Sequence, residues 1–375
     1  MASNDYRRCV RCVMDTNEPG ISFNDAGECN YCTEGLEKVR EGLLPTEERE
    51  KALKALVQKI KEEGKGKSYD CLIGLSGGAD STTVAYTVKK LGLRPYAVHL
   101  DNGWNSPEAE HNIKETAERL GIHLDTYVID PEEFIDLQRA YLRASVGNIE
   151  APTDHAISSL MLRTAAKHNI RYILTGSNIV TESIMVRGWG HYNQDLKNIK
   201  AIHKRFGTIP LKTLPTSSLV DWVRYIYVLG IRWIPFLNYI DYDKEQYKKL
   251  LAAELEWRDY GGKHYESTWT KFFQAYILPT KFGVDKRKSH LSSMICSGKL
   301  DRESALAQLA KPLYEPEEFE RDLGIVLDKL QLSREEFAGI MAQPPKKHTC
   351  YPSNAFAFES LKFLASRFRK KAITP

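Results

Sequence analysis

Four cysteines near the start of the chain have the spacing of a metal site. Cys9 and Cys12 form one C-x-x-C pair, Cys29 and Cys32 form a second, and sixteen residues separate the pairs. Zinc prefers four soft ligands in a tetrahedron, and two such pairs on a turn-rich ribbon supply them. Redox pairs and an iron–sulfur cluster are the alternatives. Because four protein ligands leave no open position, we expect a structural zinc that folds a segment too small to have its own core.

A second candidate site is the stretch SGGADS at residues 76–81, which lies between an apolar run and a helical stretch. A glycine loop that leads from a strand into a helix binds anions, because backbone N–H groups and the helix dipole point at the ligand. Gly77 and Gly78 let the backbone approach a ligand closely, and Ser76 and Ser81 add hydroxyl donors. The sequence therefore predicts a phosphate site, with an ordinary turn as the alternative.

The loop differs from the two commonest nucleotide motifs. It lacks the G-K-[ST] ending of a Walker A motif and the G-x-G-x-x-G of dinucleotide-binding folds. Asp80 is unexpected beside a phosphate unless a cation bridges the two.

Composition limits the class of protein. The chain has 375 residues, which indicates two or three domains, and a net charge of +4, which neither requires nor excludes a nucleic-acid partner. It has no apolar run long enough to span a membrane, and its N-terminus lacks an apolar signal core. We expect a cytoplasmic protein, and in that reducing compartment clustered cysteines indicate metal rather than disulfides.

Strands and helices alternate between residues 69 and about 200. Four apolar strands, at 69–75, 94–101, 123–130 and 170–177, are separated by helical stretches. This alternation predicts an α/β fold with a doubly wound parallel sheet and helices on both faces. Beyond residue 200 the alternation stops and helices are expected, one of them beginning with a capping box at Ser333 and Glu336.

We predict four parts of the chain from these patterns. They are a zinc ribbon at 1–35, a linker helix region at 36–68, an ATP-binding domain at 69–205 and a mostly helical substrate or partner region at 206–375.

The SGGADS loop resembles the S-G-G-x-D-S signature of the PP-loop ATP pyrophosphatases, the adenine nucleotide alpha hydrolase-like superfamily. These enzymes cleave ATP to AMP and pyrophosphate while they adenylate a substrate. The resemblance implies ATP and Mg²⁺ as cofactors, and backbone contact between Leu100 and the adenine. Asp101 and Gly176 end two strands at the edge of the sheet where ligands of open α/β folds bind. Asp80, with Asp101, is expected to hold Mg²⁺; loop capping is the alternative for Asp80.

Three further stretches narrow the resemblance. Residues 181–207, residues 256–298 (with DYGGKHYES and KRKSHLS) and the N-terminal ribbon are similar to the N-acetyl sugar amidotransferases of bacterial surface-polysaccharide biosynthesis, such as that of lipopolysaccharide O-antigen. The likeness extends to about residue 310. It implies that an acetamido group of a nucleotide-activated sugar becomes an acetamidino group through an O-adenylyl intermediate.

The family reading suggests roles for further polar residues. Lys263, with Lys286, Arg287 and Lys288, is expected to hold ATP phosphates or the sugar diphosphate, with a solvated charge run as the alternative. A second group follows the fourth strand and is expected to bind the sugar or move a proton. It comprises Glu182, Arg187 and His191.

Other candidates have equally strong structural explanations. Asp154 and His155 stand at the start of the helix before the fourth strand, where an acid can simply favour the helix. Three aromatic residues are candidates for stacking on a base or sugar, although aromatic side chains more often fill cores. They are Trp104, Trp189 and Tyr192.

The resemblance also implies partners. Relatives receive ammonia from a separate glutaminase, associated with a cyclase-like barrel protein, and we expect the same here. No nucleic-acid or membrane partner is expected.

The main alternative is a tRNA thiolation enzyme, which also joins a zinc ribbon to a PP-loop domain. Such enzymes usually carry catalytic cysteine pairs inside that domain, whereas Cys71 is alone there. A non-enzymatic zinc-ribbon interaction protein is a third reading, which the intact SGGADS loop disfavours.

Overall fold

A five-stranded parallel sheet organises the molecule, as seen in the computed structural model, which describes residues 6–186, 188–262 and 265–360. The spatial order is β3-β2-β1-β4-β5. The strands are β1 (Cys71–Gly74), β2 (Pro95–Asp101), β3 (His123–Val128), β4 (Tyr172–Thr175) and β5 (Arg232–Pro235). The predicted doubly wound α/β fold is confirmed, and the sheet takes a fifth strand from beyond residue 205.

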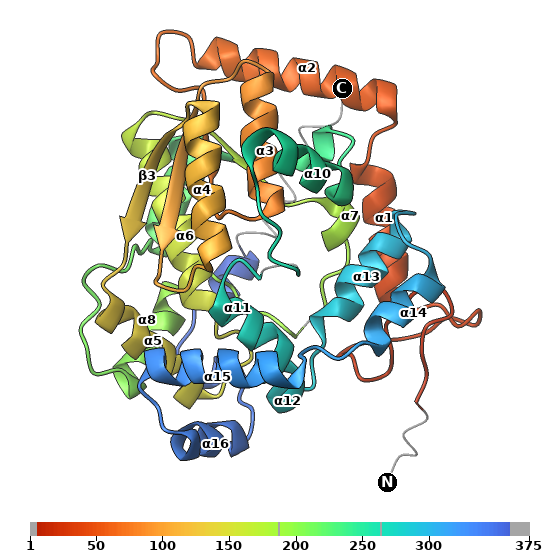
Figure 1. The fold of residues 1–375 in the computed structure, drawn as a ribbon, viewed down its shortest axis with the longest axis vertical. Coiled ribbons are helices and arrows are strands. Elements are labelled where there is room, and N and C mark those ends of the chain that lie inside the picture. Colours follow the sequence, from red (N-terminus) through yellow and green to blue (C-terminus); the bar gives the residue numbers. More distant parts are fainter. Residues whose placement is uncertain (1–5, 187, 263–264, 361–375) are drawn as a thin grey trace.

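Helices cover both faces of this sheet (Figure 1). Successive side chains of a strand point to opposite faces, so Ile73 packs against one set of helices and Leu72 against the other. The first set contains α2 (Thr46–Glu63), α3 (Ala79–Lys90) and α4 (Pro107–Leu120); the second is led by α6 (Ala151–Lys167). A strand apolar on both sides is what a doubly covered parallel sheet requires.

The N-terminal ribbon is held by two isolated antiparallel bridges, Arg8 with Asp15 and Phe23 with Cys29. Helix α1 (Asn30–Gly42) begins directly after the ribbon, and the Cys29 sulfur accepts a hydrogen bond from the Cys32 amide at its start. Figure 1 shows α1 beside α13 (Lys286–Cys296) and α7 (Ile179–Glu182), and the three helices contact one another. The helix that follows the ribbon therefore packs against the C-terminal region through α13.

Helix α5 (Pro131–Ala144) was not predicted from the sequence. Asp130 caps it by accepting a hydrogen bond from the Glu133 amide at 3.0 Å. Its buried side chains, among them Phe134 and Tyr141, pack with α8 (Leu196–Phe206) in the largest apolar core.

The C-terminal region is mostly helical, as expected. It contains α9 (Leu219–Val223), the π-helix η1 (Arg224–Val228), the 3-10 helix η2 (Phe236–Tyr239), α10 (Lys244–Leu255), α11 (Thr268–Phe272), the π-helix η3 (Phe273–Ile277), α12 (Leu278–Phe282), α14 (Arg302–Ala310), α15 (Pro316–Leu330), α16 (Arg334–Ala342) and the 3-10 helix η4 (His348–Cys350). Figure 1 shows α15 and α16 at the end of the molecule opposite α2. The capping box of α16 is confirmed, because Ser333 and Glu336 bond each other's backbone amides.

Within the described ranges, no helix combines the length and apolar character that a bilayer crossing requires.

Candidate functional site

The glycine loop connects the end of β1 to the start of α3, as predicted. Gly77 has φ +78°, and a Cβ there would collide with the Ala109 backbone of α4. Its carbonyl oxygen accepts hydrogen bonds from Asn112 Nδ2 at 3.1 Å and Trp257 Nε1 at 3.0 Å. Only glycine fits between the loop and α4 in this left-handed conformation. The loop is thus held between α4 and a segment that follows α10.

The loop hydroxyl groups lie where a phosphate oxygen would meet the first turn of α3. Ser81 Oγ lies 3.1 Å from Ser76 Oγ and accepts a hydrogen bond from the Ser76 amide at 3.2 Å. Gly78 N–H donates to Ser76 Oγ at 3.4 Å. The α3 N-terminus carries the positive end of the helix dipole. Loop and helix together form the element for which an anion site is predicted, and its hydroxyl and amide groups bond one another in this structure.

Residues that follow α10 cover this anion site. Tyr260 Oη accepts a hydrogen bond from the Ala79 amide at 3.2 Å. A Cβ on Gly78 would lie 3.4 Å from Glu266 Oε1, so that carboxylate also borders the loop. Tyr260 and Glu266 of the DYGGKHYES stretch therefore lie beside the glycine loop, whereas Lys263, a predicted site residue, falls outside the described residues.

Asp80 lies in the first turn of α3, and its carboxylate accepts a hydrogen bond from the Tyr242 hydroxyl. A Cβ on Gly176 would lie 2.9 Å from Asp80 Cβ, so the end of β4 packs directly on this turn. Asp101 ends β2, and its Oδ1 accepts from the Gly103 amide at 2.8 Å. Both carboxylates lie at the carboxyl edge of the sheet. Mg²⁺ typically uses one or two carboxylates together with substrate phosphates, so the chemical type of both side chains suits the predicted Mg²⁺ site.

A cavity of about 450 Å³ opens at the same edge of the sheet. Its walls come from the ends of β1 and β2, the start of α6, and helices α11 and α13. Three predicted site residues line it, namely Ser76, Leu100 and Lys286. Four titratable side chains also line it, namely His99, Glu150, Asp154 and Glu266. Asp154 was a candidate from the sequence, with a role at the helix start as the alternative, and the other three were not assigned to a site.

Glu150 is among the residues of this cavity that the sequence did not indicate. It immediately precedes α6 and is buried, with 9% of its surface exposed. The pKa of the Glu150 carboxyl is raised to about 7. Burial is the main cause, and the negative charge of Asp154 is the second. The opposing contributions, from the Thr270 hydroxyl, Lys286 and Trp269, are smaller. The sequence signal, an acid one residue before a helix, reveals neither its burial nor the cavity.

Several predicted residues lie outside the cavity lining. Arg287 bonds both carboxylate oxygens of Asp285 and the backbone carbonyls of Leu309 and Lys311, so its contacts fix the end of α14. Lys288 pairs with the ribbon acids Asp15 and Glu18. Glu182 ends α7 and is exposed.

The other predicted aromatic and polar residues mostly serve packing. Trp104 is buried, donates to Gln138 at 2.9 Å and stacks near Trp269. Tyr192 stacks on Phe358, and Trp189 packs partly buried against two apolar cores. Arg187 lies outside the described residues.

Two buried histidines are also held by structural contacts. His155 bonds the Asn193 carbonyl at 2.8 Å and accepts from the Ser217 amide, and burial lowers its pKa to about 4. His191 pairs with Asp195 at 3.0 Å.

The four N-terminal cysteines converge at a separate place. Their sulfur atoms all lie within 4.8 Å of one another, and all four side chains are buried. The Cys9 sulfur accepts N–H bonds from Cys12 at 3.5 Å and Cys29 at 3.2 Å. Backbone donors to sulfur suit thiolates, and four soft ligands at this separation fit a closed tetrahedral zinc site. Among the described side chains, no other three or more potential metal ligands converge this closely.

The ribbon that carries the cysteines packs on α13 and α14. The Arg302 guanidinium donates to the Cys9 carbonyl at 3.0 Å and the Cys12 carbonyl at 3.2 Å. The Val13 amide donates to Ser292 Oγ of α13 at 3.3 Å. The metal-binding segment is thus joined to the helix whose first residue, Lys286, lines the cavity.

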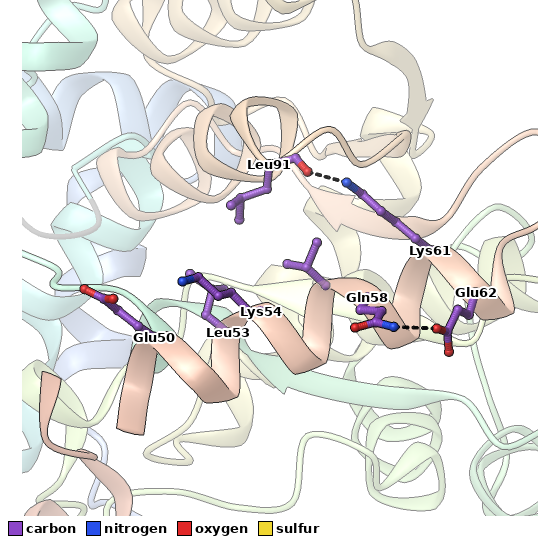
Figure 2. Close-up of a pocket in the computed structure, with 8 residues that line it drawn as sticks. Glu50, Leu53, Lys54, Gln58, Lys61, Glu62 and Leu91 are labelled. Carbon is purple, nitrogen blue, oxygen red and sulfur yellow. Dashed lines mark hydrogen bonds between the residues drawn. The ribbon is translucent and has the colours of Figure 1, made fainter. Parts of the chain in front are cut away.

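A second hollow lies away from the glycine loop. Figure 2 shows it between α2 and Leu91 at the end of α3, where Lys61 donates to the Leu91 carbonyl at 2.8 Å. Its lining is mainly apolar, from residues such as Leu53 and Val57. It contains none of the residues predicted to do chemistry.

Comparison with protein families gives two matches. The asparagine synthase family model matches residues 69–177. A family model described as LPS biosynthesis protein WbpG-like, C-terminal domain, matches residues 266–365. The first match covers the glycine loop and the strands around it, and the second covers the helices on the other side of the cavity.

Comparison with single proteins gives shorter or weaker likenesses. The chain is 38% identical over 64 residues to tRNA(Ile)-lysidine synthase of Chlamydia pneumoniae, a match that covers 16% of this chain and 20% of that protein. The chain thus spans about a fifth of the length of the curated relative that it matches.

Similar solved structures include two synthetases. NMN synthetase from Francisella tularensis is 16% identical with a TM-score of 0.29, covering 56% of this chain and 87% of that one. NH3-dependent NAD synthetase from Campylobacter jejuni is 17% identical with a TM-score of 0.29, covering 57% and 85%. With scores this low, the fold assignment rests on the strand order of the chain itself.

Proposed function

The family matches support a PP-loop amidotransferase of lipopolysaccharide biosynthesis, and from this premise we propose the reaction that the protein catalyses. In this proposal, the protein is an ATP-dependent enzyme that converts an acetamido group of a nucleotide-activated sugar to an acetamidino group. The amide oxygen attacks the α-phosphate of ATP and releases pyrophosphate. Ammonia then attacks the resulting O-adenylyl imidate and releases AMP.

The observation that carries this proposal is the shared cavity. Ser76 and Leu100 enter it from the asparagine-synthase-like region, and Glu266, Thr270 and Lys286 enter it from the WbpG-like region. One cavity thus joins an ATP-cleaving loop to the part of the chain that resembles a polysaccharide-biosynthesis protein. An adenylation enzyme needs this arrangement, because the acceptor oxygen must meet the α-phosphate directly.

Adenylation addresses the two chemical weaknesses of an amide. An amide carbonyl is a poor electrophile, and its oxygen is a poor leaving group; attaching AMP to the oxygen corrects both. The glycine loop and the N-terminus of α3 are proposed to bind the phosphates, with the Ser76, Gly78 and Ala79 amides exchanging their present partners Ser81, Ser76 and Tyr260 for phosphate oxygens. Mg²⁺, when bound, would neutralise charge on the departing pyrophosphate, and Asp80 and Asp101 are the residues proposed to hold it. Lys286 is proposed to bind a phosphate within the cavity.

The covered position of the loop also suits this chemistry. Water that reached the O-adenylyl imidate would return the amide, so the site must exclude it. Tyr260 and Glu266 border the loop, and Trp257 bonds the Gly77 carbonyl. These contacts support a role of Trp257, Tyr260 and Glu266 in shielding the intermediate.

We propose that a separate glutaminase, with a cyclase-like barrel partner, supplies the ammonia. The thiols of Cys71 and Cys296 are buried, and burial raises the pKa of both, that of Cys296 to about 12. Neither thiol is a nucleophilic thiolate at neutral pH. These two thiols are therefore unsuited to glutamine hydrolysis within the chain.

The alternative is thiolation of a tRNA base; the local match to tRNA(Ile)-lysidine synthase is a likeness to a protein named for tRNA and gives no support for thiolation itself. That match is short, and the buried Cys71 thiol does not suit sulfur transfer. The two functions differ in the acceptor that triggers pyrophosphate release.

The direct experiment incubates the protein with ATP, Mg²⁺, ammonium and a panel of N-acetylated UDP- and CMP-sugars. We expect AMP, pyrophosphate and a sugar nucleotide in which NH has replaced one oxygen, detected by mass spectrometry. Asp80→Ala should abolish this turnover while leaving the zinc content unchanged. Pyrophosphate release only with tRNA and a sulfur donor would replace the proposal with the alternative.

A further inference from the structure

A buried carboxylate in the cavity has an incomplete set of hydrogen-bond partners. Glu150 Oε2 accepts a hydrogen bond from Thr270 Oγ1 at 2.7 Å. Its other oxygen, Oε1, accepts no hydrogen bond of normal geometry among the described residues, and its polar neighbour is the Trp269 indole N–H, which lowers the pKa of this carboxyl and is itself without another partner. Glu150 is 9% exposed and lines the cavity. An ionised carboxylate has about four acceptor positions, and Thr270 and Trp269 account for two of them, so this carboxylate can also accept a proton from a ligand in the cavity.

The charged groups around Glu150 are mixed, with acids in excess. Asp154 on α6 and Glu266 before α11 line the same cavity, as do Lys286 at the start of α13 and the His99 ring from β2. An excess of carboxylates favours a cation or a proton donor over an additional phosphate group.

Two simpler explanations do not fit the contacts. The carboxylates are not an assembled metal cage, because in the described part of the chain only the four cysteines bring three or more ligand atoms within 4.8 Å. His99 is not available as a base. Its Nδ1 lies 2.9 Å from the Leu75 carbonyl, its Nε2 lies 3.0 Å from Asn105 Nδ2, and burial lowers its pKa.

We propose that Glu150 is the base that removes a proton from the nitrogen nucleophile, and that it binds ammonium in the cavity before the second half-reaction. The inference deepens the proposed function and rests on it. The pKa of about 7 that burial gives this carboxyl is well matched to accepting a proton near neutral pH.

The step balances as follows. Ammonium transfers one proton to a Glu150 carboxylate oxygen and becomes neutral ammonia. The freed lone pair forms the C–N bond to the imidate carbon. The C–O bond to the adenylyl group then breaks, and its electron pair leaves with AMP. The second proton that this nitrogen must lose passes to the departing phosphate. The product is the acetamidino group, and Glu150 returns its proton to solvent.

The test separates the two half-reactions. Adenylation is measured, without ammonium, as the exchange of labelled pyrophosphate into ATP that depends on the acetamido sugar. Amidation is measured, with ammonium, as the amount of acetamidino product formed. Glu150→Gln should keep the exchange within about twofold while losing amidation by about 10²- to 10⁴-fold. Hydroxylamine, which is largely unprotonated at neutral pH, should restore product formation by this variant. Glu132→Gln, at an exposed position in the first turn of α5, is the matched control and should change neither half-reaction.

A second variant keeps the base and changes its surroundings. The Thr270 hydrogen bond lowers the pKa of Glu150, so Thr270→Val should move the rise of the amidation rate with pH to higher pH. The assignment is overturned if Glu150→Gln retains ammonium-dependent amidation, if it loses exchange and amidation equally, or if Thr270→Val leaves the pH profile in place. A wild-type protein without exchange on any acetamido sugar would overturn the proposed function, and the assignment with it.

Discussion

The ammonium group of Lys288 in α13 lies 2.9 Å from a carboxylate oxygen of Glu18 in the N-terminal ribbon. The same group lies 3.0 Å from Asp15 Oδ1, and both acids are almost fully buried. Lys286, which lines the cavity, begins the same helix. The ribbon therefore supports the helix that carries a cavity residue, although the four cysteines of the ribbon do not line the cavity.

This relationship predicts a large stability effect for Lys288→Ala. Removing the lysine leaves two buried carboxylates without their cation, which should lower the free energy of unfolding by about 3 kcal/mol. Chemical denaturation measures the change. Lys299→Ala, at an exposed position just after the same helix, is the control and should cost well under about 1 kcal/mol. Equal effects of the two changes would mean that the ribbon contact contributes little.

The cysteine cluster predicts one structural zinc ion per chain. Cys12→Ser should lose the metal and lower the thermal unfolding temperature, because metal binding stabilises a ribbon with little core of its own. Native mass spectrometry and elemental analysis measure the metal content. Cys350→Ser removes an exposed thiol and should keep full zinc. Iron in the purified protein, or zinc retained by Cys12→Ser, would contradict the assignment.

The glycine loop predicts a specific cost for Gly77→Ala. A side chain there meets both a positive φ and the Ala109 backbone. Gly121→Ala is the matched control, because Gly121 has φ +57° with no atom within 4 Å of an added Cβ. Strain alone should cost the control about 1 kcal/mol. Gly77→Ala should cost more and also weaken ATP binding, measured by calorimetry. If ATP binding by the two variants were the same, the loop would not be the phosphate site.

The raised pKa of Glu150 predicts a pH-dependent gain in stability for Glu150→Gln. The folded pKa of about 7 lies above the ordinary value of 4.5, so ionising this buried group destabilises the fold as pH rises from 4.5 through about 7. At about 1.4 kcal/mol per pKa unit, the full effect is about 3 kcal/mol. The free energy of unfolding of the variant, minus that of the wild type, should therefore be larger at pH 8 than at pH 4. A constant difference across that range would show that Glu150 does not titrate this way.

The sequence predicted most of the elements that position the loop. The strands β1 to β4 and helices α2, α3, α4 and α6 lie where apolar runs, glycines and capping residues indicated. Helix α5 was missed because its PEEFIDLQ stretch is interrupted by charges that tertiary contacts bury, including Glu133 and Asp136. Strand β5 was missed because it is short, follows Gly230 and ends at Pro235, and glycine and proline are typical of loops.

The candidate site was predicted less completely than the fold. Ser76, Leu100 and Lys286 line one cavity, and the sequence could relate them only through motifs that flank strand ends and through a family likeness; their roles stay predictions. Glu150 has no motif, and its role depends on burial that only the folded chain reveals. The KRKS run illustrates the opposite case, since Lys286 lines the cavity while Arg287 and Lys288 bond other elements.

The central claim, that the acetamido oxygen is adenylated, has a direct isotope test. An acetamido sugar nucleotide with a heavy carbonyl oxygen is incubated with the protein, ATP and ammonium, and AMP is analysed by mass spectrometry. The account predicts that AMP carries the heavy oxygen in its phosphate group while pyrophosphate carries none. Formation of the acetamidino product with unlabelled AMP would contradict it.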